Sequence, residues 1–167
     1  MLTRLARLRV PLGFVCAMAA LVLARPTWWS WWAGLALAAS GEGIRLWAAG
    51  HIEKGREITR SGPYRLVRHP LYLGSTLLGI GFALASQNVI VWVVTVGYLG
   101  ITLAAAMRLE ERTLDARFDG AYSEYREGRA APVARAFSWA RVMMNREYRA
   151  LGGLAAAFLW LLIRMRF

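Results

Sequence analysis

The sequence predicts an all-α protein, a polytopic membrane bundle of about five transmembrane helices. The chain of 167 residues is 57% hydrophobic and 19% charged, and its mean hydropathy is +0.37. A small soluble domain has too little interior to bury so many apolar side chains, and disordered chains are poor in these residues. The apolar residues also gather in five long runs, separated by arginine-bearing segments. Each run is therefore a candidate membrane helix.

The five runs cover residues 10–24, 28–49, 71–86, 89–107 and 150–163. Several are shorter than the roughly 20 residues that span a bilayer, so flanking residues must complete them or the membrane must thin locally. The first run has an alternative interpretation as a signal peptide cleaved after Val22-Leu23-Ala24. A hairpin with the second run explains both runs, and we prefer it. The fifth run has an alternative interpretation as an interfacial or half-buried helix.

The net charge of +11 is by itself typical of a nucleic-acid binder. Threading the chain through five spans, however, puts eighteen of the 21 lysines and arginines on one side. The positive-inside rule makes that side cytoplasmic, together with the N-terminus. The long segments 50–70 and 108–149 lie on the same side and contain nearly all the titratable residues. We therefore expect a bilayer rather than nucleic acid as partner, and a functional site at the cytoplasmic face.

Two patterns within the runs predict helix contacts. Small residues at helical spacing allow helices to approach closely; the pairs are Gly34/Ala38, Ser75/Gly79 and Gly100/Ala104. Glu42 and Arg45 are costly in hydrocarbon, so they should face the inside of the bundle. Their i, i+3 spacing allows them to pair, and we prefer this structural pairing to the alternative of a direct catalytic role.

The segment between the second and third runs is rich in turn residues and in groups that form hydrogen bonds. Gly62-Pro63 ends any preceding helix, and Pro70 restricts His69 to an extended conformation with a helix starting just after it. Non-helical backbone at membrane depth survives only against protein or a polar cavity. We expect Tyr64, His69 and Tyr72 to line such a cavity. The alternative is a basic interfacial loop that holds anionic headgroups.

Two adjacent carboxylates, Glu110 and Glu111, follow directly after the fourth run. Adjacent residues on a helix point in different directions, so the two should have different roles. One can face a pocket while the other pairs with Arg108 or Arg112. No metal site is expected, because neither His51 nor His69 has a second histidine or cysteine at ligand spacing.

These motifs resemble the isoprenylcysteine carboxyl methyltransferase family, and phospholipid N-methyltransferases share the broader pattern. The similarity is carried by Gly62-Pro63-Tyr64, by Arg68-His69-Pro70-x-Tyr72-x-Gly74, and by Glu110-Glu111 followed by Phe118-x-Gly120-x-Tyr122-x-x-Tyr125. It covers roughly residues 40–132 of what we treat as one domain, 1–167. Residues 46–52 and 79–86 also look like bacterial members, which implies the bacterial inner membrane as location.

The resemblance implies S-adenosylmethionine as the cofactor and methyl donor, and a lipophilic acceptor that partitions into the membrane. By similarity, the cofactor would be held by residues of the first two motifs, the segment before them and a glutamate: Ile58, Thr59, Tyr64, His69, Pro70, Leu71, Tyr72 and Glu110. The candidate catalytic residues are Arg108, Glu110 and Glu111. Relatives with prenylcysteine substrates have an arginine one turn before the glutamate, where this chain has Ala106. Arg108 is the nearest replacement, which puts a prenylcysteine substrate in doubt.

The acceptor therefore stays open among a prenylcysteine-like carboxylate, a related isoprenoid and a phospholipid amine. Two other classes of protein compete with the methyltransferase. One is a nicotinamide-dependent reductase of sterols or other isoprenoids, which is usually a longer chain with more spans. The other is a non-enzymatic protein that binds anionic lipids through the same arginines.

Overall fold

The computed structural model of the chain describes residues 2–53, 55–118, 121–129, 131 and 133–166. These residues form helices and no strand, which confirms the predicted all-α class. The α-helices are α1 (Leu2–Leu23), α2 (Trp28–Ala49), α3 (Pro70–Ser86), α4 (Val89–Arg117), α5 (Ala121–Arg126), α6 (Trp139–Met144) and α7 (Tyr148–Arg164), and a short 3-10 helix η1 (Gly62–Arg65) precedes α3.

Each of the five apolar runs lies in a long helix: α1, α2, α3, α4 and α7 in chain order. The helix of the fourth run does not stop where the apolar residues stop, because α4 continues beyond residue 107 to Arg117. By length and composition, α4 is the one described helix that could cross a membrane. The stretches Gly13–Leu23 and Pro70–Ser86 are apolar but shorter. These criteria therefore support one of the five predicted spans.

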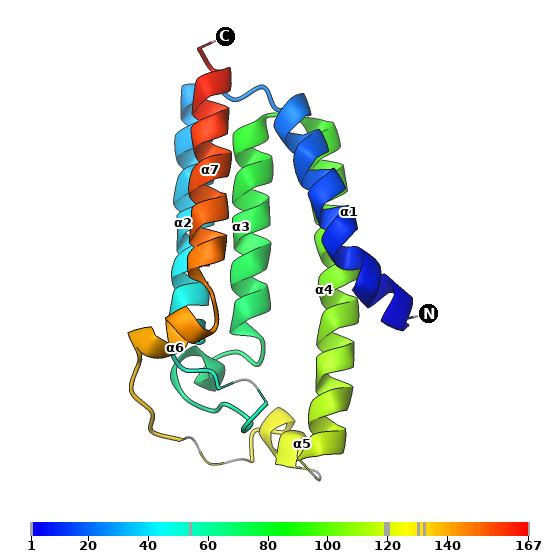
Figure 1. Ribbon diagram of the computed structural model, residues 1–167, viewed down its shortest axis with the longest axis vertical. Coiled ribbons are helices and arrows are strands. Elements are labelled where there is room, and N and C mark those ends of the chain that lie inside the picture. The colour runs from blue at the N-terminus through cyan, green and yellow to red at the C-terminus, as the bar shows by residue number, and fades with distance from the viewer. Residues whose placement is uncertain (1, 54, 119–120, 130, 132, 167) are drawn as a thin grey trace.

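The most extensive helix contact is between α2 and α3, which run side by side in Figure 1. A Cβ atom on Gly41 would lie 2.5 Å from the backbone oxygen of Gly74, and a Cβ on Gly74 would lie 2.5 Å from the oxygen of Gly41. Gly34 and Gly81 approach each other in the same way further along. Glycine is required here because any side chain would push the two backbones apart. The contact predicted for Gly34/Ala38 is thus present, whereas a Cβ on Gly100 would meet open space.

Two tight connections fix one end of the bundle. Thr27 and Ser30 form a capping box at the start of α2, and the Ser30 hydroxyl also donates to the Ala85 carbonyl at 3.1 Å. Asn88 caps α4 by accepting hydrogen bonds from two backbone amides of its first turn. The Asn88 amide in turn donates to the Leu23 carbonyl at 2.9 Å. These bonds satisfy helix-end groups that would otherwise be unpaired.

A polar cluster joins α7 to α2 and α3. Arg45 pairs with Glu42 at 3.3 Å, as predicted, and with Glu147 at the start of α7 at 2.6 Å. It also donates to the Ser75 hydroxyl on α3. Glu42 and Glu147 are buried. A carboxylate in such surroundings requires a paired cation, so Arg45 fixes the relative positions of three helices.

The segment before α7 fixes the loop that follows α2. Arg135 pairs with Glu57 at 2.7 Å. Arg141 donates to the Gly50 carbonyl at 2.8 Å, and Asn145 donates to the Ala49 carbonyl at 3.0 Å. The end of the bundle opposite the two tight connections therefore consists of this loop, η1, α5 and α6 (Figure 1).

We predict that Gly41→Ala lowers the free energy of unfolding by about 1–3 kcal/mol, because the new methyl group would overlap the α3 backbone. The matched control is Gly43→Ala on the same helix, where a Cβ meets nothing within 4 Å. That change should be neutral or slightly stabilising, since alanine favours the helix. Thermal unfolding of both variants in one detergent tests this. Equal melting temperatures for the two would show that the α2–α3 contact is looser than described.

Candidate functional site

The loop between α2 and α3 folds back against the end of α2. Gly62 has a φ of 56°, in the left-handed region that favours glycine, and a Cβ there would lie 2.6 Å from the His51 ring. His51 is buried, and its Nδ1 lies 2.9 Å from the Trp47 carbonyl oxygen. We therefore assign His51 a structural role. η1 then places Tyr64, which is also buried, beside α5. The Tyr125 hydroxyl on α5 donates to the Tyr64 carbonyl at 2.6 Å.

His69 ends this loop, and α3 starts at Pro70 as predicted. The backbone of His69 has φ −128° and ψ 64°, so it is not helical, but its ψ falls short of a fully extended strand. Its ring lies beside that of Tyr72, with 5.6 Å between centroids. Its Nε2 lies 3.0 Å from Glu111 Oε1 on α4. The loop therefore faces the polar end of α4.

The two adjacent carboxylates of α4 have different partners, as predicted. The Tyr72 hydroxyl donates to Glu110 at 2.7 Å. Glu111 contacts three other residues: His69 at 3.0 Å, the Tyr122 hydroxyl at 3.1 Å and Arg68 at 3.6 Å.

The expected pairing of one carboxylate with Arg108 or Arg112 is wrong. Arg68 supplies the charge from the loop instead, because the fold brings the loop against the face of α4 that carries Glu111. Arg108 is exposed. Within the described residues it forms no ion pair and lines none of the hollows described below.

A small hollow of about 100 Å³, here called the central hollow, lies where the loop, α4 and α5 meet. Its wall combines aromatic rings with two carboxylates, Glu57 and Glu110. Thr59 and Tyr64 also line it, and the hydroxyl oxygens of both are buried without a hydrogen-bond partner among the described residues. Such unsatisfied buried groups are rare and call for an explanation. A ligand with polar groups is one that fits.

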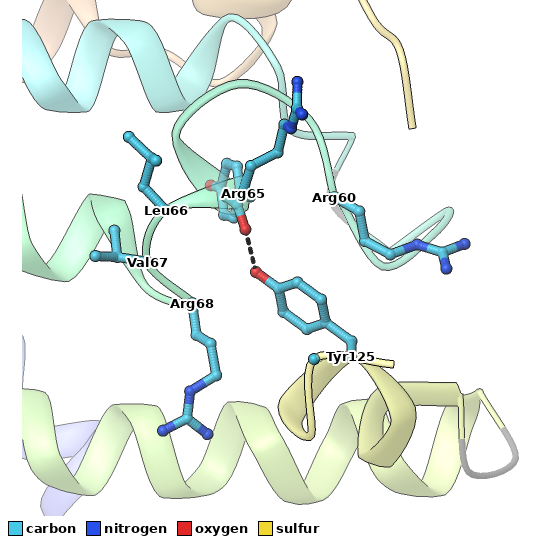
Figure 2. A pocket seen from close by; sticks show the side chains of 8 residues that line it. Arg60, Arg65, Leu66, Val67, Arg68 and Tyr125 are labelled. Carbon is cyan, nitrogen blue, oxygen red and sulfur yellow. Dashed lines mark hydrogen bonds between the residues drawn. The ribbon is translucent and has the colours of Figure 1, made fainter. Parts of the chain in front are cut away.

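Two larger hollows adjoin the central one. The apolar groove, about 490 Å³, runs between α3 and α4 and shares Arg68 and His69 with the central hollow. The arginine pocket, about 330 Å³, shares Tyr64, Arg68 and Tyr125 with it and is shown in Figure 2. The central hollow thus has an apolar neighbour on one side and a cationic neighbour on the other.

The residues predicted for the cofactor divide between these hollows. Five line the central hollow: Ile58, Thr59, Tyr64, His69 and Glu110. Tyr72 lines the apolar groove while it donates to Glu110. Pro70 and Leu71 line none of the three; Pro70 is buried at the start of α3, and the Leu71 carbonyl accepts from Ser75.

Seven residues that line the central hollow were not among the predicted site residues: Ile52, Gly55, Glu57, Arg68, Leu114, Tyr122 and Tyr125. Tyr122 and Tyr125 belong to a motif that the sequence shows, so their spacing was an available signal. Glu57 has no such signal, because its position depends on the ion pair with Arg135.

The charges of the site follow from its contacts. The hydrogen bond from His69, assisted by Tyr122 and Arg68, holds the pKa of Glu111 below its ordinary value. Burial raises the pKa of Tyr64, Tyr122 and Tyr125. At neutral pH the site therefore combines an ionised Glu111 with neutral tyrosine hydroxyls that can donate hydrogen bonds. Within the described part of the chain, no three histidine, cysteine or acidic side chains gather as they would around a metal ion.

Comparison with known proteins finds one family whose sequence profile matches this chain. The sequence profile of the phospholipid methyltransferases matches residues 14–120. The cobalt-zinc-cadmium resistance protein CzcN of Cupriavidus metallidurans is 34% identical over 94 residues, which is 55% of this chain and 42% of that protein. The chain thus spans less than half the length of this curated relative. No solved structure matches.

The lowered pKa of Glu111 predicts how stability depends on pH. A carboxyl group whose pKa is lower in the folded state stabilises the protein above its unfolded value, here 4.5, and the contribution is lost as pH falls through the folded value. Wild-type protein should therefore lose more free energy of unfolding between pH 7 and acidic pH than Glu111→Gln does. Denaturant titrations in detergent at the two pH values measure the difference.

The control for this comparison is Glu124→Gln, at an exposed position of α5. It should retain the pH dependence of the wild type. If Glu111→Gln also retained it, the network around Glu111 would not hold the ionised carboxylate.

Proposed function

We propose that this chain, which belongs to the phospholipid methyltransferase family, transfers a methyl group from S-adenosylmethionine to a lipophilic acceptor at a membrane surface. One observation carries the proposal. A polar hollow with two unsatisfied buried hydroxyl groups and two carboxylates lies beside an apolar groove between α3 and α4, and Arg68 and His69 line both. A cofactor with polar groups and an acceptor with an apolar tail require this combination.

The residues of the central hollow fit the cofactor. A sulfonium cation is attracted by aromatic faces and by carboxylates, and Tyr64, Tyr122, Tyr125, Glu57 and Glu110 supply both. The hydroxyls of Thr59 and Tyr64 are available to bind its polar groups. The central hollow alone is below the roughly 300 Å³ at which small-molecule sites begin. We infer that the cofactor also extends into the end of the adjoining apolar groove, or that α5 moves outward on binding.

The apolar groove suits the tail of the acceptor. Its wall is mostly aliphatic, with Leu73, Ile80 and Leu103 among its residues. Because the groove shares His69 with the central hollow, an acceptor whose tail lies in the groove would bring its polar head to the cofactor side. We propose that the helices of the bundle lie in the bacterial inner membrane, with the N-terminus and this site on the cytoplasmic side. The tail would then reach the groove sideways from the bilayer.

S-Adenosylmethionine supplies an already activated methyl group, so the protein mainly has to align the acceptor. Alignment can contribute roughly 7–11 kcal/mol to catalysis. A carboxylate acceptor needs no general base, whereas an amine acceptor needs one. Glu110 is the best-placed base, because it lines the central hollow and Tyr72 fixes its orientation. Glu111 and His69 form a second pair that orients the loop. Arg108 stays a candidate only for contact with the acceptor from the exposed side.

The proposal predicts saturable binding of S-adenosylmethionine and S-adenosylhomocysteine, and no comparable binding of NADPH. Purified protein in detergent is titrated with each, and methyl transfer to extracted lipids is followed with a labelled methyl group. Glu110→Gln should lower turnover by about 10²-fold or more if it acts as the base, and His69→Ala should weaken cofactor binding. Binding of NADPH alone would exclude the methyltransferase and favour a reductase.

The matched control for Glu110→Gln is again the exposed Glu124→Gln, which should leave turnover unchanged. Arg108→Ala tests whether Arg108, the remaining candidate catalytic residue, takes part in turnover. A loss of turnover as large as that of Glu110→Gln would return Arg108 to the catalytic residues.

The groove predicts a separate effect on the acceptor. Gly100 lines it, and a Cβ there would meet nothing within 4 Å, so the side chain of Gly100→Leu begins in open space beside the groove. The KM for a long-chain acceptor should rise while affinity for S-adenosylhomocysteine stays constant. Gly97→Leu is the matched control, since Gly97 is equally open but does not line the groove. If both variants behaved alike, the acceptor tail would bind elsewhere.

A further inference from the structure

The arginine pocket is not accounted for by methyl transfer. It is lined by Arg60, Arg65 and Arg68 and by no carboxylate. Figure 2 shows the three arginines spread around it, with Tyr125 contributed by α5. Among the described residues, Arg60 and Arg65 form no ion pair, and Arg68 has one, to Glu111 at 3.6 Å. The three arginine side chains point in different directions from the wall of the pocket (Figure 2), and with one ion pair among them they leave a positive charge that the protein does not balance.

One buried group that the central hollow does not share indicates a missing partner at this pocket. Arg60 Nε is buried and has no hydrogen-bond acceptor among the described residues. A phosphate group offers several acceptor oxygens and negative charge, and guanidinium groups bind it in a forked geometry.

The pocket also lies at the depth of lipid headgroups if α4 spans the bilayer. Arg68 contacts Glu111, which is four residues beyond residue 107, the end of the apolar part of α4. Four helical residues advance by about 6 Å, which is roughly the thickness of one headgroup layer. Leu66 and Val67, between Arg65 and Arg68, are both exposed, Leu66 by 76%. Apolar side chains flanked by arginines are typical of a loop that dips into a membrane surface.

The cofactor is a poorer match for this pocket. S-Adenosylmethionine carries a net positive charge at neutral pH, so three arginines would repel most of it. The central hollow has two carboxylates, Glu57 and Glu110, against one arginine, Arg68, so its charge suits the cofactor better. We propose that the arginine pocket binds the phosphate of an anionic phospholipid that is not the methyl acceptor, and so anchors the α2–α3 loop at the membrane surface. This inference rests on the membrane location proposed above and not on methyl transfer.

The test measures binding of short-chain phosphatidylglycerol to the detergent-purified chain, with short-chain phosphatidylcholine, glycerol 3-phosphate and inorganic phosphate as comparison ligands. Arg60→Gln/Arg65→Gln changes two residues that line this pocket and neither neighbouring hollow. Affinity for phosphatidylglycerol should fall by about fivefold for each arginine, or roughly 30-fold for the pair. Affinity for S-adenosylhomocysteine should not change. Leu66→Ser should weaken binding to vesicles that contain phosphatidylglycerol.

The matched control is Arg56→Gln/Arg149→Gln, which removes the same charge from two exposed arginines outside the pocket. An equal loss of lipid affinity in this control would show a non-specific effect of charge and overturn the proposal. So would an unchanged lipid affinity in the pocket variant, an equal loss of cofactor affinity, or inorganic phosphate binding as tightly as the lipid. If the pocket variant fails to fold, Arg60→Lys and Arg65→Lys keep the charge but not the fork and should each weaken lipid binding.

Wild-type protein that binds phosphatidylglycerol through these arginines but binds no methyl donor would overturn the proposed function and leave this inference standing.

Discussion

Gly41 and Gly74 allow α2 and α3 to pack backbone against backbone, and the position of the site depends on that contact. The end of α2 and the start of α3 are held close together, so the loop between them must fold on itself rather than extend. Gly62 makes the sharp turn possible against His51. As a result, the unsatisfied hydroxyls of Thr59 and Tyr64 face a common hollow. A wider helix spacing would release the loop and separate these groups.

Hydrogen bonds then connect this loop to α4 and α5. Glu110 and Glu111 are neighbours in sequence, but one accepts from Tyr72 and the other contacts His69 and Tyr122. The polar end of α4 therefore serves two purposes: it presents a carboxylate to the central hollow and it fixes the walls of that hollow. The apolar groove lies between α3 and α4 and shares Arg68 and His69 with the central hollow. A polar head and an apolar tail can therefore be bound side by side.

The apolar runs predicted the five long helices well, because they are longer than the four to eight residues that a buried strand usually has. The sequence also indicated the turn at Gly62-Pro63, the helix start at Pro70 and the different roles of the two glutamates. It could not identify Arg68 as the partner of Glu111, since that pair joins residues 43 positions apart through the fold of the loop. For the same reason the role of Glu57 and the open space at Gly100 were not foreseeable. Local sequence patterns do not predict contacts between segments that are distant in the sequence.

The central claim is that the aromatic wall of the central hollow binds the methyl donor. The most direct measurement uses S-adenosylmethionine labelled with ¹³C in the transferable methyl group and detects nuclear Overhauser effects to aromatic protons of the detergent-purified protein. Our account predicts effects from the rings of Tyr122 and Tyr125, each assigned by its loss in the corresponding Tyr→Leu variant. Saturable binding without any contact between the methyl group and these rings would contradict it.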